Sequence, residues 1–144
     1  MSNLVMKNAI DLLNEKSATC VILINDKSFI SYERGVKPLL DIIDEKYNVK
    51  GAVAADKVVG KAAAMLYILL EIKDLHACVI SELALKVLSK STINVTYDKK
   101  VPMIRNRTDT GFCPMEQATM DIDDPTEALV AIKTTLERLK NSAK

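Results

Sequence analysis

Aromatic residues are scarce in this chain of 144 residues, which has two Phe, four Tyr and no Trp. Aromatic side chains are the usual stacking platforms for single-stranded nucleic acids, so their scarcity argues against that role. Neither sign of charge is in excess, because 20 Lys and Arg stand against 19 Asp and Glu, for a net charge of +1. Without a basic excess we do not expect general affinity for nucleic acid either.

Cysteine and histidine are also rare, with three Cys and one His in the chain. Three cysteines cannot all pair, and Cys20 and Cys78 lie in apolar, strand-like runs where Cys acts as a small hydrophobic residue. Together with the absence of a signal-peptide pattern at the start, this predicts a reducing, cytoplasmic location. No Cys/His cluster has zinc-site spacing, so we expect no metal and no cofactor, and the isolated His76 is expected to be structural.

Long hydrophobic runs are absent too, and the fully apolar part of the chain's central stretch is shorter than the roughly 20 residues that a membrane span needs. Apolar spacing predicts a helix over Ala54–Leu70 that is buried on all sides toward its end. Gly60 within that helix would cost about 1 kcal/mol, so we expect a neighbour that excludes a side chain there. Lys57 and Lys61 would lie in the first turns, where the helix dipole is already positive, so an anion is expected nearby. That anion could be Asp56, another carboxylate or a bound phosphate-like ligand; alternatively, both lysines extend into water.

The rest of the chain alternates between helix-like and strand-like patterns. Helices are expected over 4–16, 36–47, 82–89 (capped by Ser81), 114–120 and from Pro125 onward, and strands over 19–24, 28–32, 49–54, 76–80 and 93–97. The polar stretch 98–110 is expected to be a loop. Strands separated by helices favour a single α/β domain over residues 1–144, built as a three-layer α/β/α sandwich.

A second polar segment precedes the expected helix over 114–120. Pro114 suits the first helical position, which places Cys113 at the N-cap. The helix dipole and nearby Arg105 or Arg107 would favour the thiolate form of Cys113, making it a candidate nucleophile or ligand contact. Glu116, at the third helical position, is expected to bond back to the N-cap N–H. The alternative is that Cys113 is only a packed small residue.

Two motifs resemble those of an uncharacterised prokaryotic family of small proteins, which is grouped by fold with the cytidine deaminases. They are Asp56-Lys57-x-x-Gly60-Lys61 followed by three alanines, and Gly111-x-Cys113-Pro114-Met115-Glu116. The resemblance covers nearly the whole chain. It implies a cytidine-deaminase-like fold, with a mixed sheet of about five strands and helices on both faces.

The same resemblance implies that zinc chemistry is absent. Zinc deaminases carry His-x-Glu at the start of the helix corresponding to Asp56 onward, and Pro-Cys-x-x-Cys at the start of the helix corresponding to Ser81 onward. This chain has Asp56-Lys57-Val58 and Ile80-Ser81-Glu82 at those places, so no metal ligands and no hydrolytic deamination are expected. From the resemblance we expect a cleft between the two helix starts, covered by the loop that carries Cys113.

These patterns leave three functions open. The first is binding of a small anionic, nucleotide-like or phosphate-like ligand in the cleft, with contacts expected from Asp56, Lys57, Lys61, Ser81, Glu82, Arg105, Arg107, Cys113 and Glu116. The second is an enzyme with Cys113 as nucleophile and Lys61 or Asp56 as acid or base. The third is a non-catalytic subunit that forms a homodimer through an edge strand or the last helix. No membrane partner is expected.

Overall fold

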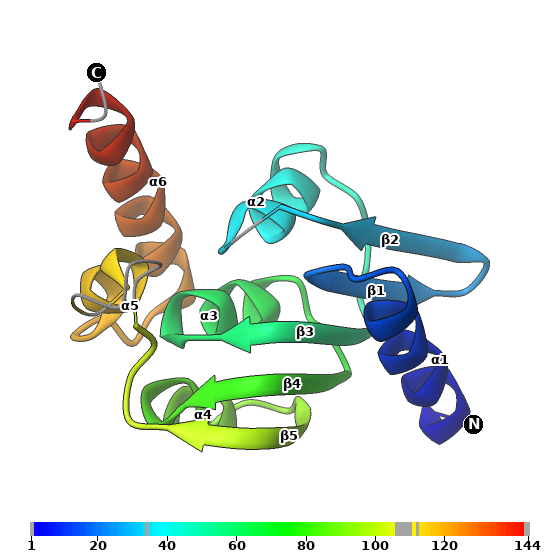
Figure 1. Ribbon diagram of the computed structural model, residues 1–144. Helices are drawn as coiled ribbons and strands as arrows, with labels where there is room; N and C mark the ends of the chain where they lie inside the picture. Colours follow the sequence, from blue (N-terminus) through cyan, green and yellow to red (C-terminus); the bar gives the residue numbers. More distant parts are fainter. Residues whose placement is uncertain (1, 34, 106–110, 112, 143–144) are drawn as a thin grey trace.

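The computed structural model describes residues 2–33, 35–105, 111 and 113–142. The chain order of the elements is seen in Figure 1. They are α1 (Ser2–Glu15), β1 (Cys20–Ile24), β2 (Lys27–Ser31), α2 (Lys37–Asp44), β3 (Val53–Val59), α3 (Lys61–Leu69), β4 (Asp74–Ser81), α4 (Glu82–Ser89), β5 (Asn94–Val101), α5 (Pro114–Thr119) and α6 (Pro125–Ser142).

The five strands form one mixed sheet in the order β2-β1-β3-β4-β5. Strand β1 runs antiparallel to β2, with which it forms a hairpin, and antiparallel to β3. Strands β3, β4 and β5 are parallel to one another. Parallel strands need helical crossovers, and α3 and α4 provide them. The mixed α/β sheet of five strands expected from the sequence is confirmed.

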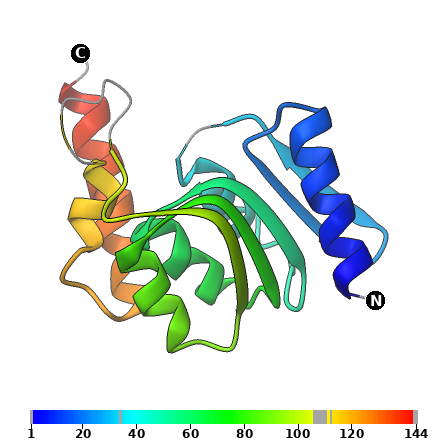
Figure 2. The ribbon, with the colours of Figure 1, turned by 60° about the horizontal axis from the view of Figure 1, so that its bottom comes forward.

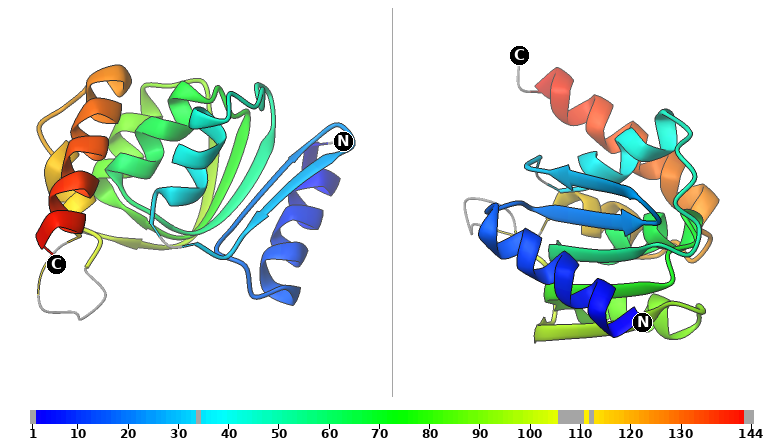
Figure 3. Two further views of the ribbon diagram at one scale, coloured as in Figure 1. Left: turned by 90° about the horizontal axis from the view of Figure 1, so that it is seen from above. Right: turned by 90° about the vertical axis from the view of Figure 1, so that its right-hand side faces the viewer.

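Helices lie on both faces of the sheet (Figure 3). Helices α2, α3 and α4 cover one face, as is expected when successive crossovers in the same direction are all right-handed. Helix α1 lies on the other face, where Ala9 and Leu13 pack against Val21 of β1 and Ala55 of β3. Helices α5 and α6 stand beyond the carboxyl ends of β3, β4 and β5, and α6 packs against α3 (Figure 2). No helix within the described ranges is both long and apolar enough to cross a membrane.

Local signals in the sequence placed several elements correctly. Helix α4 spans the predicted residues, and the Ser81 hydroxyl accepts the N–H of Ala84 at 3.0 Å, as an N-cap should. Helix α5 starts at the predicted Pro114. Helix α6 starts at the predicted Pro125, and the side chain of the preceding Asp124 accepts the N–H of Glu127 at 3.3 Å.

The predicted start of the central helix is wrong. Residues 53–59 form strand β3, and the helix begins only at Lys61, with Gly60 as its N-cap in an extended conformation. The strand is paired on both sides, with β1 and β4, and these backbone hydrogen bonds outweigh the helical spacing of its apolar residues. Asp56 and Lys57 are therefore strand residues. Lys57 does not lie in the first turn of a helix, so the expected unfavourable interaction with a helix dipole does not arise there.

The predicted loop over 98–110 is wrong in its first part, because β5 continues to Val101. The residues at the end of this strand are charged and exposed, which made them look like a loop. Charged side chains are typical of edge strands, where they discourage pairing with other chains.

Asp56 is buried between the sheet and α3. Its Oδ2 accepts a hydrogen bond from the Tyr67 hydroxyl at 2.6 Å, and its Oδ1 accepts the N–H of Val58 at 3.2 Å. The Cys20 sulfur lies 3.4 Å from the same hydroxyl. Burial raises the pKa of Asp56 from 3.8 to about 7, although these hydrogen bonds act in the opposite direction. Burial and the nearby Asp56 also raise the pKa of Cys20 and of Tyr67.

A raised pKa in the folded state makes stability depend on pH. The stabilisation is complete below the ordinary pKa of 3.8 and is lost as the pH rises through about 7, because the charged form is then buried. We therefore predict that the free energy of unfolding falls with rising pH, by at most about 1.4 kcal/mol per pH unit from this group. Asp56→Asn, which keeps the size of a neutral carboxyl group, should remove this slope in urea titrations.

The matched control is Asp26→Asn, in the exposed turn between β1 and β2. It should keep the slope of the wild type. Identical pH profiles for the wild type and Asp56→Asn would contradict the prediction.

Candidate functional site

The side chain of Glu116 joins three segments at the carboxyl end of the sheet. Glu116 lies on α5 and is 1% exposed. Its Oε2 accepts the backbone N–H of Lys61 at 2.6 Å and the Ser81 hydroxyl at 2.7 Å. Its Oε1 accepts the backbone N–H of Ile104 at 2.6 Å. Three short hydrogen bonds replace the water that the buried carboxylate gives up.

Two helix starts converge on this one carboxylate. Lys61 is the first residue of α3, and Ser81 is the N-cap of α4. A helix start has free N–H groups and the positive end of the helix dipole, so it favours an anion. Of the three anions that the sequence left open, the one found here is another carboxylate, that of Glu116. It reaches across to α3 and α4, so the expected bond to its own N-cap is replaced by these contacts.

Gly60 has the close neighbour that the sequence predicted. A Cβ atom added at this residue would lie 2.9 Å from Oε2 of Glu116 and 3.2 Å from Cγ1 of Ile104. The backbone of Gly60 is extended, with φ −95°, so its conformation is open to any residue. The constraint is therefore the space that the Glu116 carboxylate occupies.

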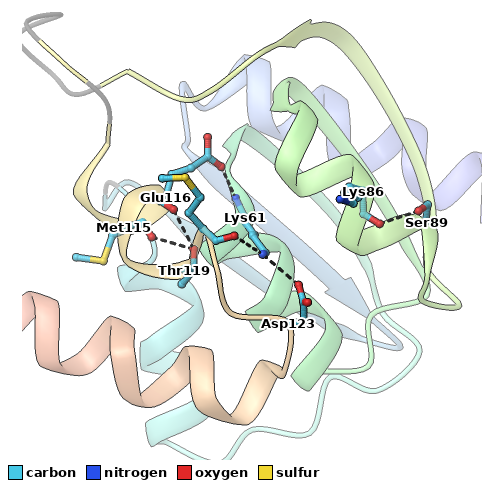
Figure 4. A network of polar contacts seen from close by, with 8 residues as sticks. Lys61, Lys86, Ser89, Met115, Glu116, Thr119 and Asp123 are labelled. Atoms are coloured by element: carbon cyan, nitrogen blue, oxygen red, sulfur yellow. Dashed lines mark hydrogen bonds and ion pairs between the residues drawn. The ribbon is translucent and has the colours of Figure 1, made fainter.

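The ammonium group of Lys61 points away from Glu116, toward the connection between α5 and α6 (Figure 4). It donates to the carbonyl of Met120 at 2.9 Å and lies 3.3 Å from Oδ1 of Asp123. The Lys61 side chain is 6% exposed, whereas that of Asp123 is 85% exposed. Solvent screening at Asp123 weakens this pair, so the positive charge of Lys61 is only partly neutralised.

A hollow of about 430 Å³ opens beside Lys61, between α3, α4 and the α5–α6 connection. Lys86 and Lys90 line it from the side of α4, and Asp121 and Asp123 line it from the connection. Sequence reasoning missed this hollow. The signal available was the spacing of Lys86 and Lys90, because residues four apart lie on the same side of a helix.

The other predicted site residues are spread over the molecule. Asp56 is enclosed beneath α3 with Tyr67, and the exposed Lys57 follows it on β3. The sheet register pairs Asp56 with Ala77, four residues before Ser81, so the predicted meeting of Asp56 with Ser81 is not observed. Where the sequence predicted a cleft between two helix starts, Lys61 and Ser81 instead meet the buried carboxylate of Glu116.

Cys113 is the N-cap of α5, as predicted, and its N–H donates to the carbonyl of Ile104 at 2.8 Å. Its side chain is half-buried and packs against the main core. Arg105 is exposed next to Ile104, and Glu82 is exposed in the first turn of α4. Arg107 lies outside the described residues.

The fold and this arrangement define an α/β protein with a mixed five-stranded sheet, in which an internal carboxylate holds two helix starts. Residues 8–136 match the family described as "TM1506: Domain of unknown function (DUF1893)", and the chain belongs to this family. It is similar to the crystal structure of the DUF1893 family protein TM1506 from Thermotoga maritima, with 29% sequence identity and a TM-score of 0.81. The match covers 93% of this chain and 89% of that one. No curated protein matches.

The contact between Gly60 and Glu116 can be tested by a double-mutant cycle. We predict that Gly60→Ala destabilises the wild type by about 1–3 kcal/mol, since the new Cβ crowds a carboxylate fixed by three hydrogen bonds. Glu116→Ala should cost at least about 3 kcal/mol, because it leaves buried donors without a partner. In that background the cost of Gly60→Ala should largely disappear, since the space is vacant.

Urea unfolding of the four proteins provides the measurement. Glu137→Ala, on the exposed side of α6, is the control for loss of a glutamate and should change stability little. An equal cost of Gly60→Ala in both backgrounds would show that the two residues do not interact.

Proposed function

We propose that this protein binds a small anionic, phosphate-bearing molecule in the hollow beside Lys61. The observation that carries the proposal is the gathering of Lys61, Lys86 and Lys90 around one concave surface. Lys86 and Lys90 are exposed, and neither has an ion-pair partner within the part of the chain that the structure describes. Their charges are therefore available to a ligand.

The remaining walls of the hollow fit the rest of such a molecule. Ile68, Leu83 and Val87 supply apolar surface against which a ring or short carbon chain can pack. The volume of about 430 Å³ lies within the range of small-molecule sites, which are concave, largely apolar and provided with a few polar groups. Asp121 and Asp123 can accept hydrogen bonds from hydroxyl or amino groups of the ligand.

This proposal moves the ligand from the place that the sequence suggested. Glu116 fills the junction of the two helix starts, so we place the anion beside it, along the exposed side of α4. The convergence of those helix starts supports the cytidine-deaminase-like relationship proposed from the motifs. A phosphorylated ligand also agrees with the proposed cytoplasmic location. Among the described residues, no contact of Cys113 favours the nucleophile hypothesis over simple packing, and the homodimer hypothesis stays a prediction.

The test is calorimetric titration with inorganic phosphate, pyrophosphate and a panel of nucleoside monophosphates. We predict binding by at least one of these anions, weakened about tenfold or more in the double variant Lys86→Ala/Lys90→Ala, since each lost charge-assisted hydrogen bond is worth about 1.5–3 kcal/mol. Lys61 is left unchanged in this test because its contacts also hold the α5–α6 connection.

The control is Lys99→Ala/Lys100→Ala, which removes the same charge from β5, away from the hollow. It should bind like the wild type. The proposal fails if none of the anions binds, or if the two double variants lose affinity equally, since the effect would then come from net charge alone.

A further inference from the structure

Three side chains of types that can bind a metal ion, those of His76, Cys78 and Asp98, lie together on the face of the sheet opposite α3. His76 and Cys78 lie two residues apart on β4, and alternation along a strand puts both on the same face. Asp98 follows on β5, whose register pairs Ala77 with Tyr97 and so brings Asp98 level with Cys78. One ligand atom from each of the three residues lies within 4.8 Å of the other two.

The separations suit a small divalent ion. Zinc bonds of about 2.0–2.3 Å at tetrahedral angles place neighbouring ligand atoms roughly 3.3–3.6 Å apart. Nε2 of His76 already lies 3.4 Å from Oδ1 of Asp98. The side chain of Asp98 is 68% exposed and Cys78 is half-buried, so small rotations can complete the contacts while His76 stays fixed.

His76 is oriented by a partner on its other ring nitrogen. Its Nδ1 lies 2.7 Å from the Thr96 hydroxyl. When Nδ1 donates its proton to that hydroxyl, the lone pair of Nε2 is directed toward Asp98 and Cys78. Metal-binding histidines are commonly held in this way by a hydrogen bond from the nitrogen that does not bind the metal.

We propose that His76, Cys78 and Asp98 bind Zn²⁺ or a similar borderline divalent ion. Nitrogen, thiolate and carboxylate donors are the set that zinc prefers, and a site with three protein ligands leaves a fourth position for water or a small ligand. That position faces solvent on the side of β5, where Thr96, Asp98 and Lys100 are exposed, whereas α1 packs over β1 and β3 and reaches β4 beside Cys78. Burial and the charge of Asp98 raise the pKa of the Cys78 thiol, whereas the exposed Lys57 on β3 acts in the opposite direction and its long side chain can turn toward water.

The sequence alone predicts no metal site, because no Cys/His cluster has the spacing of a known zinc motif. Here two donors come from the alternation of one strand and the third comes from its neighbour. The site shares no residue with the hollow beside Lys61, so the two proposals stand or fall separately.

Cobalt(II) is a suitable probe, because a thiolate ligand gives it a strong near-ultraviolet charge-transfer band and tetrahedral coordination gives visible bands. The full chain, treated with a chelator and then dialysed, is titrated with Co²⁺ and afterwards with Zn²⁺. We expect one Co²⁺ per chain with both sets of bands, and loss of the bands when Zn²⁺ displaces the cobalt.

Variants assign the ligands. Cys78→Ser should abolish the charge-transfer band, whereas Cys113→Ser, the control on α5, should keep it. His76→Ala and Asp98→Asn should weaken Zn²⁺ binding strongly. Thr96→Val, which removes only the positioning hydroxyl, should weaken it by about 10–100-fold. Thermal unfolding of each variant in the metal-free state checks that it folds.

The proposal is overturned if the wild type gives no thiolate band, or if Cys78→Ser, folded like the wild type, keeps it. Loss of the band in Cys113→Ser would equally overturn it, since the bound ion would then lie elsewhere. In any of these cases the contact between His76 and Asp98 does not serve to bind a metal ion.

Discussion

The carboxylate of Glu116 is the interaction on which the carboxyl end of this sheet depends. It accepts hydrogen bonds from the start of α3, the cap of α4 and the segment that follows β5, so one side chain fixes three stretches that are distant in sequence. Each donor is a group that burial would otherwise leave unpaired at a cost of about 1–3 kcal/mol. The absence of a Cβ at Gly60 belongs to the same arrangement, because the carboxylate occupies the space that a side chain would need.

This constraint also decides where a ligand can bind. In open α/β sheets, ligands usually bind beyond the carboxyl ends of the parallel strands, where helix starts provide N–H groups. Here the chain supplies its own anion at that place. Lys61 contributes to both places. Its backbone N–H donates to the Glu116 carboxylate, and its ammonium group lies at the wall of the neighbouring hollow. Glu116 therefore occupies the junction of the helix starts, and the lysines of the proposed site, Lys86 and Lys90, lie beside it on the side of α4.

The sequence predicts those parts of the structure that depend on neighbouring residues. The Ser81 hydroxyl caps α4 by accepting the N–H of Ala84, only three residues further along the chain, and Pro114 starts α5. Both signals can therefore be recognised from neighbouring residues in the sequence. The stretch 54–59 misled because its apolar residues fit a helix as well as a buried strand, and only pairing with β1 and β4 decides between them. The contacts of Glu116 with Lys61 and Ser81 span 55 and 35 residues, so the pattern could indicate an anion beside Lys61 but could not identify its source.

The alternation of side chains along a strand explains why the two faces of the sheet differ in chemistry. The face under α3 is closed, so Asp56 satisfies its carboxyl group internally through Tyr67. On the opposite face α1 packs mainly over β1 and β3 and also contacts β4, so His76 is buried and Cys78 half-buried there, whereas the residues of β5 are exposed to water. A histidine, a thiol and a carboxylate can face one another in such a place because solvent and side-chain rotation remain available to them. The same residues beneath α3 would have to find fixed partners, as Asp56 does, or be excluded from the core.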